Sequence, residues 1–157
     1  MKKKIDLYYE RNEDMKIAIG CDHGGFELKQ QIIEYLKSTG KEFEDFGCMS
    51  ENSCDYPEYG KAVAKAVAAG KFDFGILICG TGIGMSITAN KVKGIRAALC
   101  GDSFSAEATR EHNNTNVLCL GARVTGAGLA LNIVDTFLNT PFSNDERHIR
   151  RISMLED

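Results

Sequence analysis

Short β-rich runs alternate with amphipathic helical runs along most of this chain, and this alternation limits the fold more than any other feature. The β-rich runs predict strands at residues 16–21, 42–46, 74–79, 95–100 and 117–120. The amphipathic runs predict helices at residues 26–37, 57–69, 84–92, 103–111 and 125–139. Units that alternate in this way build a parallel sheet that helices cover on both faces. The sequence therefore predicts an α/β fold, a three-layer α/β/α sandwich with a five-stranded parallel, Rossmann-like sheet.

The chain is long enough for one domain with a sizeable core. Its 157 residues, of which 43% are hydrophobic, give no reason to divide it in two. We expect a single domain over residues 15–157, which includes an arginine-bearing helix at its C-terminal end. Residues 1–14 form an N-terminal extension of unknown role, with mixed charge and a small apolar cluster. The extension could be a tail, an artefact of expression or a packed strand, and we favour a packed segment.

Charge and cysteine usage exclude several classes of function. The net charge of -3 and the isoelectric point near 5.7 argue against a general nucleic-acid or anionic-membrane surface. No apolar stretch approaches the roughly 20 residues that a membrane-spanning helix needs. The six cysteines include no CxxC pair, and the chain carries no secretory signal pattern. We therefore expect a cytoplasmic protein that binds small anions but neither nucleic acid nor a membrane.

A glycine-rich turn follows the strand at residues 74–79 and carries a cysteine at its rim. The segment is Cys79-Gly-Thr-Gly-Ile-Gly84. Alternate glycines let the backbone approach a ligand and point several N–H groups at one place, where they stabilise negative charge. By itself Cys79 would be taken for a buried strand cysteine, but the glycines that follow it favour an active-site thiol.

The same turn has a rival interpretation as a dinucleotide-binding loop. Asp102 stands near the separation at which a ribose-binding acid is expected after such a turn. However, the spacing is GxGxG rather than GxGxxG, and the turn follows the third strand instead of the first. We therefore prefer to interpret Asp102 as a turn residue or as the cap of the helix that begins near Ser103.

Other polar residues stand at the ends of predicted elements. Asp22 and His23 follow the first strand, so they share the carboxyl edge of the sheet with Cys79. His112 lies among turn-forming asparagines, which predicts a loop near the end of a helix. Taken singly, a helix-terminal aspartate and exposed histidines would be ordinary surface features.

Cations that could hold a phosphate occur near the C-terminal end. Arg147 and Arg151 are four residues apart, so they share one face of a predicted helix and can clamp a phosphate. The alternative is a solvated helix face, and we expect that description to fit Arg150.

Three segments closely resemble the B-type ribose-5-phosphate isomerases, of the family shared with isomerases of allose and galactose phosphates. They are Gly20-Cys-Asp-His-Gly-Gly-Phe26, Cys79-Gly-Thr-Gly-Ile-Gly84 and Glu111-His-Asn-Asn-Thr-Asn116. The resemblance covers nearly everything after Met15. It implies an aldose-ketose isomerase that interconverts ribose 5-phosphate and ribulose 5-phosphate through a cis-enediolate, in the pentose phosphate pathway.

Such an isomerisation needs a base near carbon, a site that stabilises an anion and a proton carrier between oxygens. The resemblance implies Cys79 as the base, Thr81 as the carrier and His112 as the group that opens the sugar ring. Tyr56 matches a family position near the sugar, although it could equally pack against the second helix. The substrate contacts that the resemblance implies are Asp22, His23, Tyr56, Gly80, Gly82, Ile83, Gly84, Asn113, Arg123, Arg147 and Arg151.

The resemblance also implies an enzyme without a cofactor that works as a homodimer, with active sites between subunits; a tetramer is a further option. No metal site is expected, because three scattered histidines do not make a zinc pattern. Two alternatives stay open at this point. The chain could isomerise allose 6-phosphate or galactose 6-phosphate, or it could be a non-catalytic module that binds a nucleotide or phosphate.

Overall fold

Five parallel strands form the middle layer of the structure, a computed structural model that describes residues 15–156. The extension at residues 1–14 lies outside the described residues. The strand order in the sheet is β2-β1-β3-β5-β4. The strands are β1 (Lys16–Cys21), β2 (Glu42–Asp45), β3 (Phe74–Cys79), β4 (Ala97–Leu99) and β5 (Val117–Gly121). The predicted five-stranded parallel sheet is thus confirmed.

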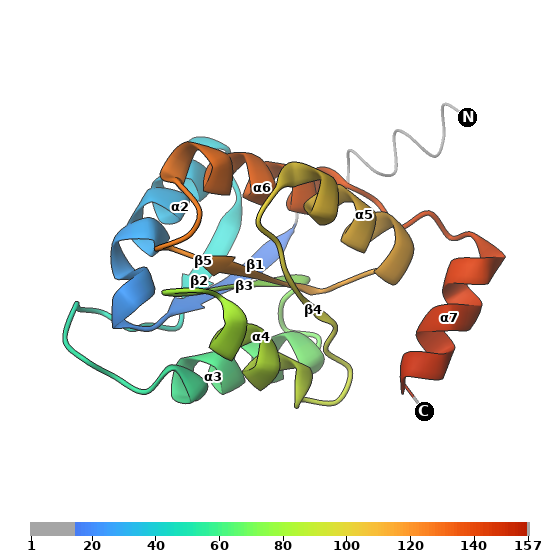
Figure 1. Ribbon diagram of the computed structural model, residues 1–157, viewed down its shortest axis with the longest axis horizontal. Helices are drawn as coiled ribbons and strands as arrows, with labels where there is room; N and C mark the ends of the chain where they lie inside the picture. Colours follow the sequence, from blue (N-terminus) through green and yellow to red (C-terminus); the bar gives the residue numbers. More distant parts are fainter. Residues whose placement is uncertain (1–14, 157) are drawn as a thin grey trace.

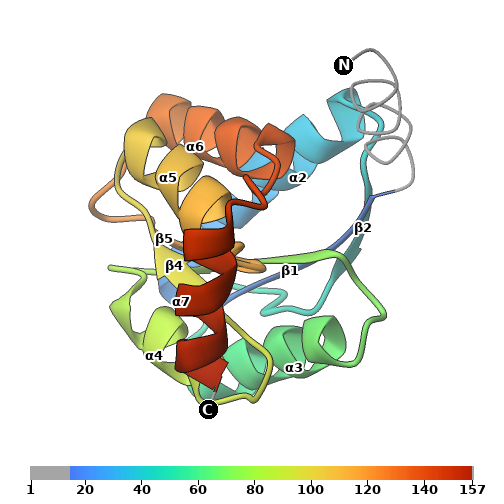
Figure 2. The ribbon, with the colours of Figure 1, turned by 90° about the vertical axis from the view of Figure 1, so that its right-hand side faces the viewer.

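Helices cover both faces of this sheet (Figures 1 and 2). One face carries α2 (Phe26–Ser38), α5 (Ser103–Asn113) and α6 (Ala127–Asn139). The other face carries α3 (Tyr56–Ala68) and α4 (Ile83–Asn90). A short 3-10 helix, η1 (His23–Gly25), joins β1 to α2. The predicted three-layer α/β/α sandwich is therefore also confirmed.

Alternate residues of the central strands pack against opposite layers, as the pleat of a strand requires. Ile76 and Ile78 of β3 belong to the core under α2 and α6, whereas Leu77 and Cys79 belong to the core over α3 and α4. The central strands are buried on both faces, which explains their continuous apolar sequence.

The chain reverses its direction of travel across the sheet between β1 and β3. From β1 the chain passes through α2 to the edge strand β2, and from β3 it passes through α4 to the opposite edge strand β4. In open α/β sheets, ligands bind beyond the carboxyl ends of the strands at such a reversal. The fold therefore directs attention to the loops that follow β1 and β3.

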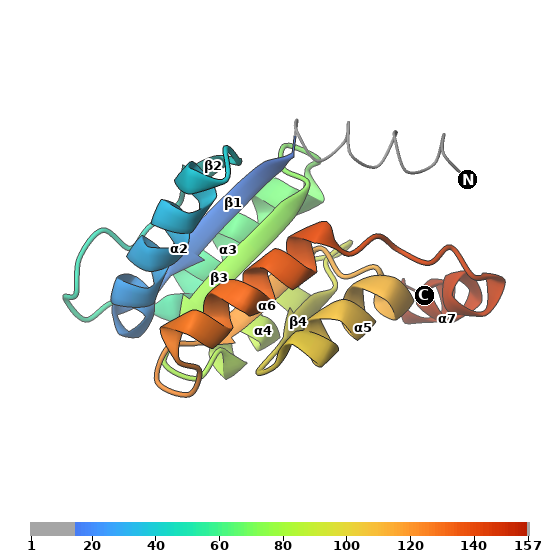
Figure 3. The same cartoon turned by 90° about the horizontal axis from the view of Figure 1, so that it is seen from above.

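The last helix, α7 (Glu146–Glu156), stands apart from the three layers and touches α5 (Figure 3). An ion pair of 2.5 Å between Arg96 and Glu156 ties its end to the segment before β4. The helical spacing predicted for Arg147 and Arg151 is confirmed. None of the helices in residues 15–156 has the length and apolar character needed to cross a bilayer.

One predicted boundary is wrong in a way that matters for the site. Helix α5 ends at Asn113, so His112 and Asn113 form its last turn instead of a loop. Asn114 ends the helix in the left-handed conformation, with a φ of 45°. Asparagine adopts this conformation more readily than most residues, so the second asparagine of the run caps the helix and the first one is its last residue.

A buried ion pair joins α2 to β2. The Lys29 side chain has no exposed surface, and its Nζ lies 2.8 Å from both carboxylate oxygens of Asp45. The same Nζ donates to the carbonyl oxygen of Cys48 at 2.6 Å. Asp45 also accepts a backbone hydrogen bond: the N–H of Gly47 donates to its Oδ1 at 2.9 Å. This pair therefore fixes the start of the loop that leads from β2 to α3.

Candidate active site

Three loops meet at the carboxyl edge of the sheet, after β1, β3 and β5. The N–H groups of Ala122 and Arg123 donate to the carbonyl oxygens of Cys79 and Gly80, each at 2.9 Å. On the other side, the N–H of Asp22 donates to Ile78 at 3.1 Å. These bonds hold the loop after β1 and the loop after β5 on either side of the glycine-rich turn.

Cys79 lies at the floor of the turn with 6% of its surface exposed. The N–H of Gly82 donates to its sulfur at 3.1 Å, a bond that a thiolate accepts more strongly than a thiol. Gly82 has a φ of 77° and directly precedes α4, a conformation that favours glycine. A Cβ there would also lie 2.5 Å from the Leu99 side chain. The glycine is therefore needed for the bond to the sulfur.

Thr81, Ile83 and Gly84 complete the glycine-rich turn. Thr81 is exposed, and its hydroxyl oxygen accepts the N–H of Ile83 at 3.3 Å. Ile83 is the exposed first residue of α4, and Gly84 follows it. The first N–H groups of a helix have no partner within the helix, so this end of α4 favours negative charge. The turn can therefore stabilise an oxyanion next to the Cys79 thiol.

Most of the other cysteines are held as thiols. Burial raises the pKa of Cys21 and Cys119 well above the usual range of a thiol. Burial raises the pKa of Cys100 to about 11, with a smaller contribution from Asp102. Burial also raises the pKa of Cys54. These four groups stay protonated near neutral pH, so they are poor candidates for a base or a nucleophile.

Three polar groups from three different loops lie close around Gly24. A Cβ on Gly24 would lie 3.3 Å from Oδ1 of Asp22, 3.3 Å from the N atom of Gly80 and 3.5 Å from a terminal nitrogen of Arg123. Gly80 is close to the same arginine, because a Cβ there would be 3.3 Å from it. An acceptor, a backbone donor and a cation thus converge where a polyhydroxylated anion can bind.

His23 and Tyr56 flank this group. The Nδ1 atom of His23 accepts the N–H of Cys54 at 3.3 Å, so the neutral ring carries its hydrogen on Nε2 and is a donor there. Tyr56 begins α3, and a Cβ on Gly84 would lie 2.8 Å from its ring. Tyr56 therefore contacts the start of α4, which places its ring beside the glycine-rich turn.

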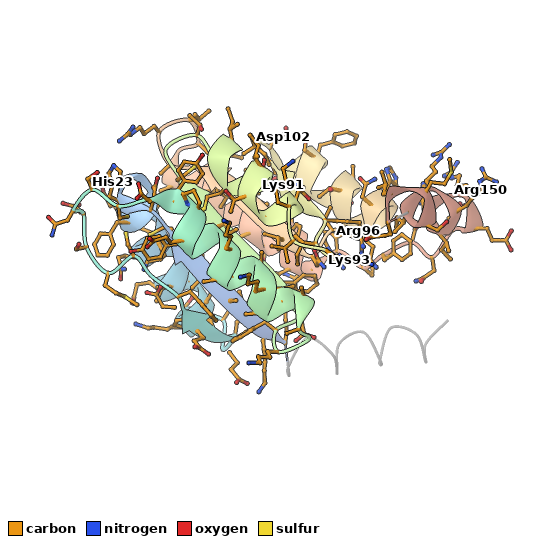
Figure 4. The ribbon with its side chains drawn as sticks, turned by 90° about the horizontal axis from the view of Figure 1, so that it is seen from below. His23, Lys91, Lys93, Arg96, Asp102 and Arg150 are labelled. Atoms are coloured by element: carbon orange, nitrogen blue, oxygen red, sulfur yellow. The ribbon has the colours of Figure 1, made fainter. Side chains whose placement is uncertain are left out.

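Four of the candidate residues lie elsewhere in the chain. Helix α5 starts at the carboxyl edge and has 11 residues, which span about 16 Å, so its last turn reaches the amino edge of the sheet. His112 and Asn113 occupy that turn, and Arg147 and Arg151 lie on the neighbouring helix α7. Figure 4 shows the separation, with His23 at one end of the molecule and Arg150 of α7 at the other. One chain therefore presents two separate groups of candidate residues.

The second group has its own surroundings. His112 is exposed, and its ring centroid lies 4.5 Å from that of His148. Arg147 is exposed and pairs with Asp145 at 3.3 Å. A cavity of about 640 Å³ borders this group and is lined by the segment from Val92 to Ala98 together with Asn113 and Leu155. The cavity is thus at the amino edge, away from the Cys79 turn.

Asp102 caps helix α5, as preferred from the sequence. Its Oδ1 accepts the N–H of Ser105 at 2.7 Å, and its Oδ2 accepts the Ser105 hydroxyl at 2.9 Å. These bonds hold the pKa of the Asp102 carboxyl below its ordinary value. The carboxylate is therefore engaged in a capping role, which removes the main support for the dinucleotide interpretation.

Within residues 15–156, no three side chains of His, Cys, Asp or Glu gather closely enough to hold a metal ion.

Two positions of interest were missed in the sequence. Gly24 was overlooked although it follows Asp22 and His23, and a pair of glycines directly after a strand is the signal that could have found it. His148 was overlooked because it stands between the arginines of the last helix. Its contact with His112 depends on how α7 packs on α5, which no local pattern reveals.

Comparison with known proteins gives a consistent result. A family model described as Ribose/Galactose Isomerase matches residues 17–155. Ribose-5-phosphate isomerase B of Escherichia coli is 50% identical over 140 residues, which cover 89% of this chain and 93% of that protein. Galactose-6-phosphate isomerase subunit LacB of Clostridium acetobutylicum is 48% identical over 128 residues, 82% of this chain and 74% of the subunit.

A solved structure agrees with these sequence matches. The structure of ribose-5-phosphate isomerase B from Clostridium thermocellum superimposes with a TM-score of 0.89 at 53% identity. The match covers 90% of this chain and 95% of the other. Fold, sequence and the extent of the matches all agree, and the chain belongs to the ribose/galactose isomerase family.

Proposed function

We propose that this protein interconverts ribose 5-phosphate and ribulose 5-phosphate through a cis-enediolate, as an aldose-ketose isomerase. The observation that carries the proposal is the Cys79 sulfur, held by the Gly82 N–H at 3.1 Å where three loops converge. A base at the end of a strand, next to a turn that favours negative charge, suits abstraction of a proton alpha to a carbonyl group.

The carboxyl-edge group would carry out proton transfer. Cys79 takes the proton from C2 and returns it to C1, while the N–H groups at the start of α4 stabilise the enediolate oxygens. Thr81 has the hydroxyl that moves a proton between those oxygens. Asp22 accepts hydrogen bonds from sugar hydroxyls, and Arg123 adds positive charge beside them.

The amino-edge group would prepare and hold the substrate. Ribose 5-phosphate is mostly a closed ring, so the ring must open before C2 can lose its proton. His112 can act as the acid and base for that step, and Asn113 can bind a hydroxyl. Arg147 and Arg151 lie one turn apart on α7 and can bind the phosphate together.

Both groups must act on one sugar, and this requirement supports a site shared between two copies of the chain. In one chain they stand at opposite edges of the sheet. A two-fold dimer would bring the carboxyl edge of each copy to the amino edge of its partner and create two equivalent sites. Exposed apolar side chains occur at both places, Phe104 and Val124 near the carboxyl edge and Met154 and Leu155 on α7. Such residues are typical of surfaces that another chain covers.

The redox state of the cysteines supports a place in the cytoplasm. All six are free, and Cys79 must stay reduced to act as a base. A reducing compartment keeps thiols in this state.

The direct test is turnover of ribose 5-phosphate in buffer treated with a chelator, measured as ribulose 5-phosphate formed. Allose 6-phosphate and galactose 6-phosphate are assayed alongside. We expect ribose 5-phosphate to give the highest kcat/KM. The similarity to a galactose-6-phosphate isomerase subunit makes that hexose the main competitor. If no sugar phosphate turns over, and the chain binds phosphate or a nucleotide, it is a binding module.

Replacing His112 with Gln is expected to slow one direction of the reaction. The C5 oxygen of ribulose 5-phosphate carries the phosphate, so this ketose cannot close a five-membered ring and needs no ring opening. At saturating substrate, kcat from ribose 5-phosphate should fall about 100-fold, because closed rings occupy the site. The initial kcat from ribulose 5-phosphate should stay within about twofold of wild type. Equal losses in both directions would contradict a ring-opening role for His112.

Mixing Cys79→Ala with His112→Gln, which both turn over ribose 5-phosphate poorly, is expected to restore this turnover if the site is shared. In a Cys79→Ala and His112→Gln mixed dimer, one site carries both substitutions and the other carries neither. After joint refolding, turnover of ribose 5-phosphate should reach about a quarter of wild type, because half of randomly formed dimers are mixed and each has one intact site. If the refolded mixture recovers no activity, each copy builds its whole site alone. Each variant refolded by itself is the control.

A further inference from the structure

The His148 imidazole lies against the His112 imidazole. The two ring centroids are 4.5 Å apart and the ring planes are tilted by 41°. His148 belongs to α7, whereas His112 belongs to the last turn of α5. His148 is 6% exposed, whereas His112 is exposed. The buried His148 ring therefore supports the His112 ring, which faces solvent.

The supporting ring is itself held in place. The Ser143 hydroxyl oxygen lies 2.8 Å from Nδ1 of His148 and accepts the N–H of Asp145 at 3.2 Å. The backbone N–H of Ser143 donates to the carbonyl oxygen of Glu111, the residue before His112. The segment that orients His148 is therefore bonded directly to the turn that carries His112.

The surroundings keep the supporting ring uncharged near neutral pH. Burial lowers the pKa of His148, and His112, Arg147 and Arg151 lower it further, against a smaller opposite effect of Asp145. The Glu111 carboxylate on α5 lies 3.9 Å from Nε2 of His112. A neutral ring can stack on His112 without charge repulsion, whichever protonation state His112 takes during ring opening.

We propose that His148 is a positioning residue, whose ring, fixed by Ser143, holds the His112 imidazole in the orientation that ring opening requires. This inference rests on the proposed role of His112 in the isomerase. His148 need not touch the sugar for this role. Its effect should therefore appear only in steps that use His112.

The test uses the two directions of the reaction on the full-length protein. With His148→Ala, kcat from ribose 5-phosphate should fall about tenfold, whereas the initial kcat from ribulose 5-phosphate should stay within about twofold. His148→Phe restores a flat ring without the bond to Ser143, so it should recover only part of the lost kcat. Arg150→Ala is the matched control on the same helix, an exposed residue outside the proposed site, and should leave both directions unchanged.

The double variant separates this inference from the proposed function. If His148 acts through His112, adding His148→Ala to His112→Gln should cost no further activity in either direction. An additive loss, an equal loss in both directions, or no loss with His148→Ala would overturn the positioning role. If His112→Gln itself has no directional effect, the proposed role of His112 fails instead.

Discussion

Cys79→Ala is expected to abolish isomerisation in both directions, with kcat lowered by about 1,000-fold or more. The alanine removes the sulfur that the Gly82 N–H holds at 3.1 Å and leaves the glycine-rich turn with its N–H groups but no base. Proton transfer between C2 and C1 is common to the forward and reverse reactions. The loss should therefore be symmetric, unlike the loss with His112→Gln.

Binding should survive this substitution, because Asp22 and the arginines proposed to hold the phosphate are unchanged. Isothermal titration of Cys79→Ala with ribose 5-phosphate should give a Kd close to the KM of the wild type. Cys100→Ala is the matched control: burial raises the pKa of this thiol to about 11, and the variant should keep most of the activity. If Cys79→Ala loses binding together with turnover, or keeps turnover within tenfold of the wild type, Cys79 is a structural cysteine.

The sequence predicts which candidate residues meet at the carboxyl edge, because their positions depend on local features. Cys79 and Asp22 each stand directly after a buried strand, and parallel strands bring such positions to one edge. The glycines of the turn have a backbone reason for their positions, which Gly82 illustrates with its positive φ. Arg123 joins the same group because β5 is the next strand in the sheet, so its loop runs beside the turn.

The other half of the candidate site is harder to derive from sequence. The position of His112 follows from where α5 stops, and α5 stops two residues later than predicted, before the left-handed cap at Asn114. Its neighbour His148 comes from a helix outside the three layers, whose packing on α5 has no local signature. Hydrophobic periodicity thus predicts the helices, but it does not predict which side chains meet when one helix packs on another.

The burial of Lys29 is likewise hard to predict from sequence, although the helix that carries it is predicted well. The apolar spacing in α2 correctly places Leu28, Ile32 and Leu36 in the core. Lys29 is next to Leu28 in the chain and is also fully buried, although lysine is seldom buried unless it is paired. Its partner Asp45 lies on β2, 16 residues away in sequence, and the pairing depends on how α2 packs against that strand.

Asp45→Ala is expected to lower the free energy of unfolding by about 3–5 kcal/mol, since removal of one partner leaves the buried Lys29 ammonium without its counter-charge. The carbonyl of Cys48 and the face of the Phe26 ring, whose centroid lies 5.5 Å from Nζ, would remain as uncharged partners. Urea unfolding, followed by circular dichroism, measures the loss as a lower midpoint. The matched control is Glu42→Ala on the same strand. Glu42 pairs with Lys16 at 3.1 Å, but both side chains are more than half exposed, so the cost should be about 0–1 kcal/mol.

The double variant Lys29→Met with Asp45→Leu tests why Asp45→Ala lowers the free energy of unfolding. It removes both charges together and should recover most of the stability that Asp45→Ala loses, because the cost lies in an unpaired buried charge and not in the loss of attraction alone. The pair also holds the loop after β2, where Gly47 donates to Asp45 and where Cys54, farther along, donates to His23. The recovered protein should therefore fold stably and still bind sugar phosphate more weakly than the wild type. A cost for Asp45→Ala no greater than that for Glu42→Ala would show that water reaches Lys29 and that the charge is not confined to the interior.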